Sequence, residues 1–432
     1  MIPPHRYGVR TASLLVVASM VGTGVFTTSG LLLAQLGSIG AVLLVWIAGG
    51  VVALAGALSY AELAAHAPES GGEYALLART FHPAVGFCAG VVSIIAGFAA
   101  PIAACAIAFA HYLAAIVPEL PETLVAILIV IVASTIHALH LRAGARFQDA
   151  MTIAKLALIA LFTIAGALRA DLSRLLEPLE PSAIATPSFA IGLVLVYFAY
   201  TGWNAAAYIA GEVDRPSRTL PLALLLGTLG VTALYVALNA VFLAAAPPSE
   251  LAGRIEVGAI AAQHLFGPMA ARVLSAVIAL GLVSTIGAFV VTGTRVYDAM
   301  GRDHARLSFL ARRTAGGAPI VAIAIQAALA IAMVLTASFE VLLGAVGFTL
   351  SIASGLTVVG LLIERRRHPA RPLPYRVPLY PVTPLFFVGV MAWTVVQSIL
   401  HVREIAWIGL AIIALGLVGF FVLTARTRAK TA

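Results

Sequence analysis

Charged residues are scarce in this sequence. Only 10% of its 432 residues are Asp, Glu, Lys or Arg, whereas a soluble domain typically has about 25%. Hydrophobic residues make up 61% of the chain, and the mean hydropathy is +1.04. Because no soluble fold can bury that much apolar surface, the composition excludes a soluble protein and predicts a membrane protein.

Long polar connections are also missing. Hydrophobic segments that reach or approach the ~20 residues needed to cross about 30 Å of hydrocarbon follow one another along the chain. The longest connections, near 170–187 and 247–267, leave no room for a soluble domain. We expect an all-α membrane protein with a single transmembrane domain over residues 1–432 and about twelve transmembrane helices. The predicted segments are 12–36, 39–64, 84–116, 122–140, 147–169, 188–211, 219–246, 268–299, 318–336, 340–364, 384–401 and 404–425.

Cysteine is nearly absent, and so are the signatures of intramembrane enzymes. Cys88 and Cys105 fall in one predicted helix, roughly 26 Å apart at about 1.5 Å per residue, so they cannot pair with each other. The sequence has no H-E-x-x-H, no G-x-S-x-G and no pair of intramembrane aspartates. It also lacks the selectivity filter or charge ring expected of a channel. We expect no enzyme activity, no cofactor and no metal site.

The basic residues are unevenly placed. The net charge of +8 would suit a nucleic-acid-binding protein, but the positions of the charges follow membrane topology instead. If the N-terminus is cytoplasmic, 20 of the 26 Lys and Arg residues lie on the inner side and 5 on the outer side, with Lys155 within the membrane. This asymmetry predicts a multi-pass protein of the inner (cytoplasmic) membrane, in contact with lipid and not with nucleic acid, with both termini cytoplasmic.

The first and the sixth segments are interrupted near their middle. The first contains Val21-Gly22-Thr23-Gly24-Val25, and the sixth contains the stretch 198–204, FAYTGWN. For either segment alone, small residues that let helices pack closely are the simpler explanation. Interruptions at matching places in two halves of a chain instead point to the binding site of an inverted-repeat transporter.

An unwound helix suits a zwitterion. The freed backbone groups are tolerable in a bilayer only where something polar meets them. The N-terminus of the following half-helix attracts a carboxylate, and the freed carbonyls attract an ammonium. We therefore expect an amino acid at this place. The carboxylate is expected near Thr23, Gly24 and Val25, and the amine near the carbonyls of Met20, Val21, Phe198, Ala199 and Thr201.

Both interrupted segments resemble those of the amino acid-polyamine-organocation superfamily of permeases, closest to the L-type amino acid transporters and their bacterial relatives. Residues 56–63 (GALSYAEL) and 68–74 (PESGGEY) extend the likeness, which covers almost the whole chain. The resemblance implies a LeuT-like fold with alternating access, in which inverted repeats of five helices, 12–169 and 188–364, precede two further helices in 384–425. It also implies that Phe198 closes over the substrate and that Trp203 and Asn204 gate or support the break.

Lys155 lies well inside the fifth segment. An ammonium at that depth is costly and marks function by default, and the alternative is a lysine that snorkels to the membrane surface. The resemblance implies that Lys155 stands where sodium-coupled relatives hold a cation, near Gly22 and near Ser284 or Thr285. Transport would then be independent of sodium, and whether Lys155 releases its proton is left open.

The substrate is expected to be a neutral amino acid, because the expected lining is apolar and no carboxylate is placed between the breaks to meet a cationic side chain. The coupling partner would be a proton (symport) or a counter-substrate (exchange). The alternative is a cationic amino acid or polyamine antiporter, which the same superfamily contains. The resemblance implies no obligatory protein partner, because some related animal transporters bind a heavy subunit through a cysteine in an outer loop, and neither cysteine here lies in a loop.

Overall fold

The computed structural model describes residues 7–66, 71–139, 141–176, 186–314, 317–370 and 372–428. Within these residues the regular structure is helical, apart from an isolated bridge between Tyr7 and Val213, which confirms the all-α class. The α-helices are α1 Val9–Met20, α2 Gly24–Leu36, α3 Ile39–His66, α4 Glu73–Thr80, α5 Pro83–Val92, α6 Ala100–Ala114, α7 Glu122–Leu139, α8 Leu141–Ala167, α9 Pro187–Tyr200, α10 Ala205–Tyr208, α11 Pro216–Ala245, α12 Pro248–Leu251, α13 Val257–Phe266, α14 Pro268–Asp303, α15 Ile320–Thr336, α16 Phe339–Arg367, α17 Val382–His401 and α18 Arg403–Arg428.

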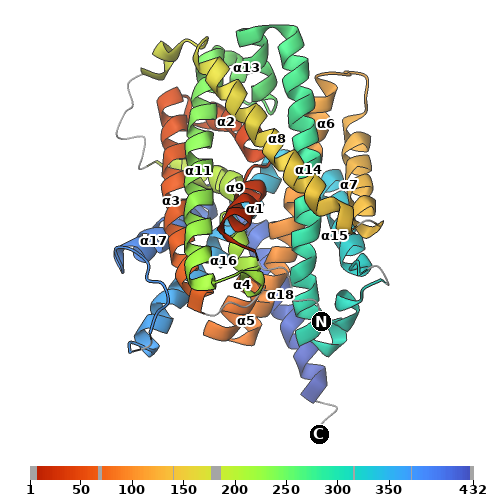
Figure 1. Ribbon diagram of the computed structural model, residues 1–432, viewed down its shortest axis with the longest axis vertical. Helices are drawn as coiled ribbons and strands as arrows, with labels where there is room; N and C mark the ends of the chain where they lie inside the picture. The colour runs from red at the N-terminus through yellow and green to blue at the C-terminus, as the bar shows by residue number, and fades with distance from the viewer. Residues whose placement is uncertain are drawn as a thin grey trace.

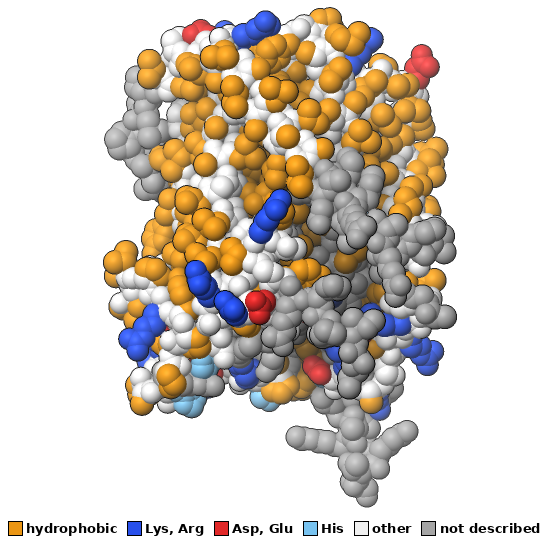
Figure 2. Space-filling view, viewed as in Figure 1, with side chains coloured by type: hydrophobic (Ala, Val, Ile, Leu, Met, Phe, Trp, Pro, Cys, Tyr) orange, Lys and Arg blue, Asp and Glu red, His pale blue; other side chains and the backbone are white. Residues whose placement is uncertain are grey.

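The protein is a multi-span membrane protein. Among the described residues, seven helices are long and apolar enough to cross a membrane, and the bent pair α1 and α2 would make an eighth. The expected segments 122–140, 147–169, 188–211 and 318–336 are matched in part by shorter apolar helices. Figure 2 shows hydrophobic side chains over a broad band of one face, with Lys and Arg gathered mainly toward its lower end and upper rim. Such a band suits a lipid environment.

Several helices form outside the twelve expected segments. Residues 247–267, expected as a plain connection, contain α12 and α13, and a short helix α4 follows α3. Residues 68–70 of the PESGGEY stretch and residues 177–185 of the other long connection lie outside the described residues. Cys88 and Cys105 are both free and buried; their spacing predicted only that they do not pair with each other.

Helix α1 occupies the middle of the bundle. Figure 1 shows it between α11 and α14, and it contacts both of these long helices. Glycine permits some of these close approaches, because a Cβ built on Gly227 of α11 would lie 2.7 Å from Cγ1 of Val16 in α1. The interrupted first segment is therefore held at the core of the molecule, where irregular backbone is shielded from lipid.

Candidate substrate site

The first helix is broken at Val21–Thr23. Helices α1 and α2 flank these residues and are bent by 40° relative to each other. The carbonyl of Met20, at the end of α1, accepts hydrogen bonds from the Gly22 N–H at 2.8 Å and from the Tyr235 hydroxyl at 2.6 Å. The hydroxyl of Thr23 is buried and has no hydrogen-bond partner among the described residues. The break thus places backbone polar groups and the Thr23 hydroxyl at the centre of an apolar bundle.

The sixth helix is broken at the stretch 201–204. Helix α9 ends at Tyr200, a turn follows, and the chain resumes as α10 and the 3₁₀ turn η4, Ala210–Glu212. Gly202 has φ +95°, a conformation that a residue with a side chain rarely adopts. The Thr201 backbone N–H and hydroxyl both donate to the Phe198 carbonyl, at 2.9 and 2.7 Å. The expected position of this break is therefore the observed one.

The two breaks interlock. A Cβ built on Gly24 would lie 2.4 Å from the Ala199 Cβ, and one built on Gly202 would lie 2.6 Å from the Ser19 carbonyl carbon. The Tyr235 hydroxyl on α11 reaches across them, since it approaches the Met20 carbonyl at 2.6 Å and the Ala199 carbonyl at 3.2 Å. Three residues expected at one substrate site, Met20, Gly24 and Ala199, therefore lie close together.

Tyr235→Phe should weaken transport without unfolding the protein. The substitution removes one hydroxyl, and a net hydrogen bond contributes about 0.5–1.5 kcal/mol, so initial uptake should fall by about threefold to tenfold. Tyr297→Phe is the matched control, because the buried Tyr297 hydroxyl has no hydrogen-bond partner among the described residues. Equal uptake by the two variants in proteoliposomes would contradict a role for the Tyr235 hydroxyl at the breaks.

Lys155 of α8 reaches the first break. Its side chain is buried, with its ammonium donating to the Val21 carbonyl at 2.5 Å and to the Thr285 hydroxyl at 3.3 Å. Gly22 lies next to Thr285, since a Cβ built on Gly22 would lie 3.4 Å from Cγ2 of Thr285. No carboxylate pairs with Lys155 among the described residues. The ammonium therefore sits among neutral oxygens, as a bound metal cation would.

A cavity lies beside the breaks. It has an empty volume of about 670 Å³, part of it open to solvent, and the expected residues Thr201, Trp203, Asn204 and Thr285 line it. A π-helical turn, η1 Ser93–Ala99 between α5 and α6, adds Phe98 to its wall. Turns of this kind occur frequently at functional sites. Residues not singled out from the sequence also line it, namely Ser19, Glu73, Tyr197, Tyr208 and Phe289.

The remaining expected residues lie deeper. Met20, Val21, Val25, Phe198 and Ala199 are each at most 4% exposed and do not line the cavity. The carbonyls of Met20, Val21 and Phe198 already accept two hydrogen bonds each from the protein itself. An ammonium at these carbonyls would therefore have to displace or share a donor.

Trp203 lines the cavity and also packs outward. Its ring meets Tyr60 of α3 edge-on at 4.7 Å between centroids and meets Phe387 of α17 at 5.9 Å. Aromatic pairs at these separations stabilise a bundle. Trp203 therefore braces the break against two neighbouring helices.

Glu73 was not predicted from its position in the sequence. It follows the Gly71-Gly72 pair, is 1% exposed, and accepts hydrogen bonds from the Tyr60 hydroxyl at 2.7 Å and from the Asn204 amide at 3.3 Å. Glu73 thus places a carboxyl on the cavity wall beside the break of the sixth helix, where the sequence offered no clearly placed carboxylate. The signal available in the sequence was an acidic residue directly after a glycine pair, within a stretch that carries the family resemblance.

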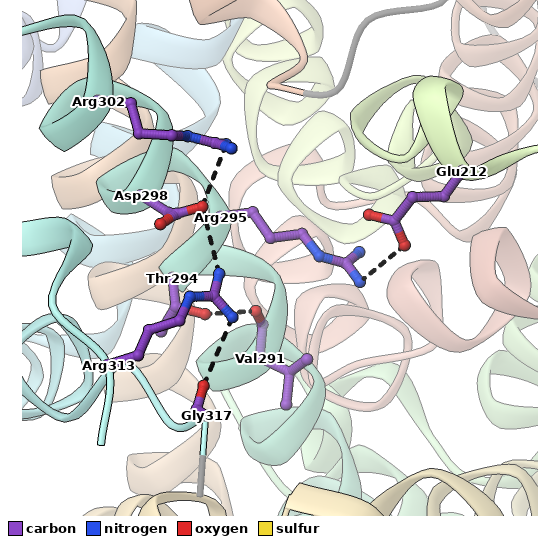
Figure 3. A network of polar contacts seen from close by, with 8 residues as sticks. All are labelled: Glu212, Val291, Thr294, Arg295, Asp298, Arg302, Arg313 and Gly317. Atoms are coloured by element: carbon purple, nitrogen blue, oxygen red, sulfur yellow. Dashed lines mark hydrogen bonds and ion pairs between the residues drawn. The ribbon is translucent and has the colours of Figure 1, made fainter. Parts of the chain in front are cut away.

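Two other acidic residues pair with distant arginines. Glu62 binds Arg365 through two contacts of 2.6 Å, and Figure 3 shows Glu212 of η4 paired with Arg295 of α14, at 3.5 Å. Arg215 and Arg218, which lie close to Glu212 along the chain, belong to neither pair. Helix packing, and not proximity along the chain, selects the partners.

Interrupted, interlocking helices around a buried ammonium and a polar cavity are typical of a secondary transporter. The family model for amino acid permeases matches residues 7–420, and the chain belongs to this family. Large neutral amino acids transporter small subunit 2 of Rattus norvegicus is 28% identical over 429 residues, covering 96% of this chain and 80% of that protein.

Two further relatives in Mus musculus have similar coverage. The b(0,+)-type amino acid transporter 1 is 25% identical over 410 residues, covering 93% of this chain and 83% of that protein. The Asc-type amino acid transporter 1 is 26% identical over 430 residues, covering 96% and 80%. The family resemblance read from the motifs is confirmed, and so is the expectation that the protein is a transporter and not an enzyme.

Proposed function

We propose that the protein is a sodium-independent secondary transporter of neutral amino acids, working by proton symport or substrate exchange. The observation that carries the proposal is the Lys155 ammonium, held by the Val21 carbonyl and the Thr285 hydroxyl at the break of the first helix. A fixed positive charge at that place can support the broken backbone without a sodium ion.

The transport cycle would be alternating access between two inverted repeats of five helices, residues 12–169 and 188–364, with twelve crossings in the cytoplasmic membrane and both termini cytoplasmic. The substrate amine would approach the Ala199 and Thr201 carbonyls, and its carboxylate would approach the N-terminus of α2 at Thr23–Val25. Phe198 would close over the bound substrate. Names of the relatives support the substrate class, since each is an amino acid transporter and one is specified for large neutral amino acids.

Uptake of labelled amino acids into proteoliposomes tests this function. We expect leucine and alanine to enter equally well in sodium and in choline buffers, and entry to rise with an imposed inward proton gradient or with unlabelled substrate inside. The measurement is the initial rate in each condition. Uptake that requires sodium would contradict the role given to Lys155, and failure of every amino acid and amine to enter would contradict the function itself.

A cationic amino acid or polyamine antiporter is the second candidate. The Glu73 carboxyl on the wall of the cavity favours it, because a carboxylate among aromatic rings attracts an ammonium or a guanidinium. Competition separates the two candidates. Arginine and putrescine would suppress labelled uptake more strongly than leucine and alanine if this candidate is correct, and less strongly if the transporter takes neutral substrates.

A further inference from the structure

Glu73 is a buried carboxyl without a cationic partner among the described residues. Its Oε1 accepts the hydrogen bonds from Tyr60 and Asn204, whereas its Oε2 is buried and has no hydrogen-bond partner in the part of the chain that the structure describes. No ion pair among these residues includes Glu73. A carboxylate removed from water is unstable unless a counter-charge or a proton neutralises it. The surroundings of Glu73 therefore call for one of the two.

A glycine turn fixes Glu73 against the broken sixth helix. Gly71 and Gly72 have φ of +129° and +55°, and a Cβ on Gly72 would lie 2.3 Å from the Tyr208 ring. The Gly71 N–H also donates to the Tyr208 carbonyl, at 3.3 Å. Residues with side chains do not fit this turn. The start of α4 is thus docked on the half-helix that follows the break.

Among the described residues, the titratable groups that face Glu73 are phenols. They are Tyr60 of α3, Tyr197 of α9 and Tyr208 of α10. The other elements packed on α4 carry polar and charged groups that bond elsewhere. Arg365 of α16 binds Glu62, Arg367 of α16 donates to the Thr80 carbonyl, Asp303 of α14 accepts from Tyr74, and His82 before α5 accepts from the Ala84 N–H.

We propose that Glu73 is the proton-binding group of the substrate cavity and that its protonation loosens the tie between α4 and Asn204 in the sixth-helix break. This proposal rests on the proposed transport function. A proton from water in the cavity binds the free Oε2 and leaves again as a hydrated proton, so no other reactant is needed. The ionised carboxyl is a stronger acceptor for the Asn204 amide than the neutral acid is. Protonation therefore weakens the hydrogen bond between Glu73 and Asn204, and the turn at Gly71-Gly72 is then free to move.

The burial of Glu73 Oε2 favours a proton over a substrate cation as the group that binds there. A substrate ammonium would have to displace Tyr60 or Asn204 to reach this carboxyl, whereas a proton needs no added volume. Along the chain, Glu73 lies between the membrane-spanning segments Ile39–His66 and Pro83–Ala114, and not within either of them. Burial raises its pKa to about 7, and the hydrogen bonds from Tyr60 and Asn204 oppose the rise. The group is therefore mostly neutral below about pH 7 and mostly ionised above it.

Exchange of labelled alanine at equal pH on both sides of the membrane tests this role, since alanine keeps the same net charge from about pH 5.5 to about pH 8.5. We expect wild-type exchange to rise at least about threefold toward the acidic end, with its midpoint near 7. Glu73→Gln cannot titrate, so its exchange should vary by less than about twofold over the same range, whatever its absolute level.

Tyr60→Phe keeps the proposal testable if Glu73→Gln is inactive. It removes a hydrogen bond that lowers the pKa of Glu73, so the midpoint should move to higher pH by about half a unit to one unit. Tyr297→Phe, which removes a hydroxyl without a described hydrogen-bond partner, should keep the wild-type profile.

Three results would overturn the role of Glu73. They are a flat wild-type profile, a Glu73→Gln profile with the wild-type slope, and an unmoved midpoint in Tyr60→Phe. A Glu73→Gln variant that keeps the pH slope but loses inhibition by arginine or putrescine would identify Glu73 as a partner for cationic substrates. Absence of exchange by the wild-type protein at every pH refutes the transport function, and a wild type that exchanges with no pH dependence refutes only this proposal.

Discussion

Lys155→Met is expected to reduce substrate uptake by at least about tenfold while leaving the fold intact. Methionine keeps the length of the side chain and removes the ammonium that binds the Val21 carbonyl and the Thr285 hydroxyl. A hydrogen bond to a charged group contributes about 1.5–3 kcal/mol, so the initial rate in proteoliposomes should fall by about tenfold to more than a hundredfold.

Stability should respond differently from transport in this variant. Lys155 is buried without a carboxylate partner among the described residues, and replacing a buried charge by an apolar group of similar size is often neutral or stabilising. Thermal unfolding in detergent should therefore occur at the wild-type temperature or above it. Uptake within about threefold of wild type, or an equal loss of uptake and of stability, would count against a functional role for the ammonium.

The positions of both breaks could be predicted because the signal is local. Glycines and hydroxyls in the middle of an apolar run weaken a helix wherever the run is placed, and the structure interrupts the helices at Val21–Thr23 and at 201–204. The burial of Lys155 could be predicted for a similar reason. A single ammonium followed by a long uncharged run lies inside the helix bundle and needs polar partners there. The expected partner was Ser284 or Thr285, and the Lys155 ammonium donates to the Thr285 hydroxyl.

The cavity wall could not be predicted because it depends on contacts between distant segments. Glu73 and Asn204 meet across 131 positions, and Glu62 and Arg365 across 303. Proximity along the chain does not indicate these pairs, because Arg215 and Arg218 are nearer to Glu212 in the sequence than its partner Arg295 is. The π-helical turn at Ser93–Ala99 also lacks a local signal, since its residues read as an ordinary apolar helix.

Gly202→Ala and Gly24→Ala are expected to reduce uptake by at least about tenfold, because each adds a Cβ where the two breaks touch. The Cβ at position 202 would lie 2.6 Å from the Ser19 carbonyl carbon, and the one at position 24 would lie 2.4 Å from the Ala199 Cβ. Contacts that short do not occur between real atoms, so one break must move away from the other. The measurement is the initial uptake rate together with the elution profile of the purified protein.

Gly253 and Gly230 serve as controls that separate the effect of a close contact from the effect of backbone strain. Gly202 combines a positive φ with a close contact, and Gly24 has the contact alone. Gly253 has φ +75° with open space around it, and Gly230 has neither feature. Gly253→Ala should therefore cost about 1–3 kcal/mol of stability through strain, with uptake reduced by less than about twofold. Gly230→Ala, inside α11, should leave uptake unchanged and raise stability by up to about 1 kcal/mol. If Gly253→Ala lowers uptake as much as Gly202→Ala does, strain and not the meeting of the breaks explains the loss. If Gly24→Ala transports normally, the first and sixth helices do not need to touch at this point for the cycle to proceed.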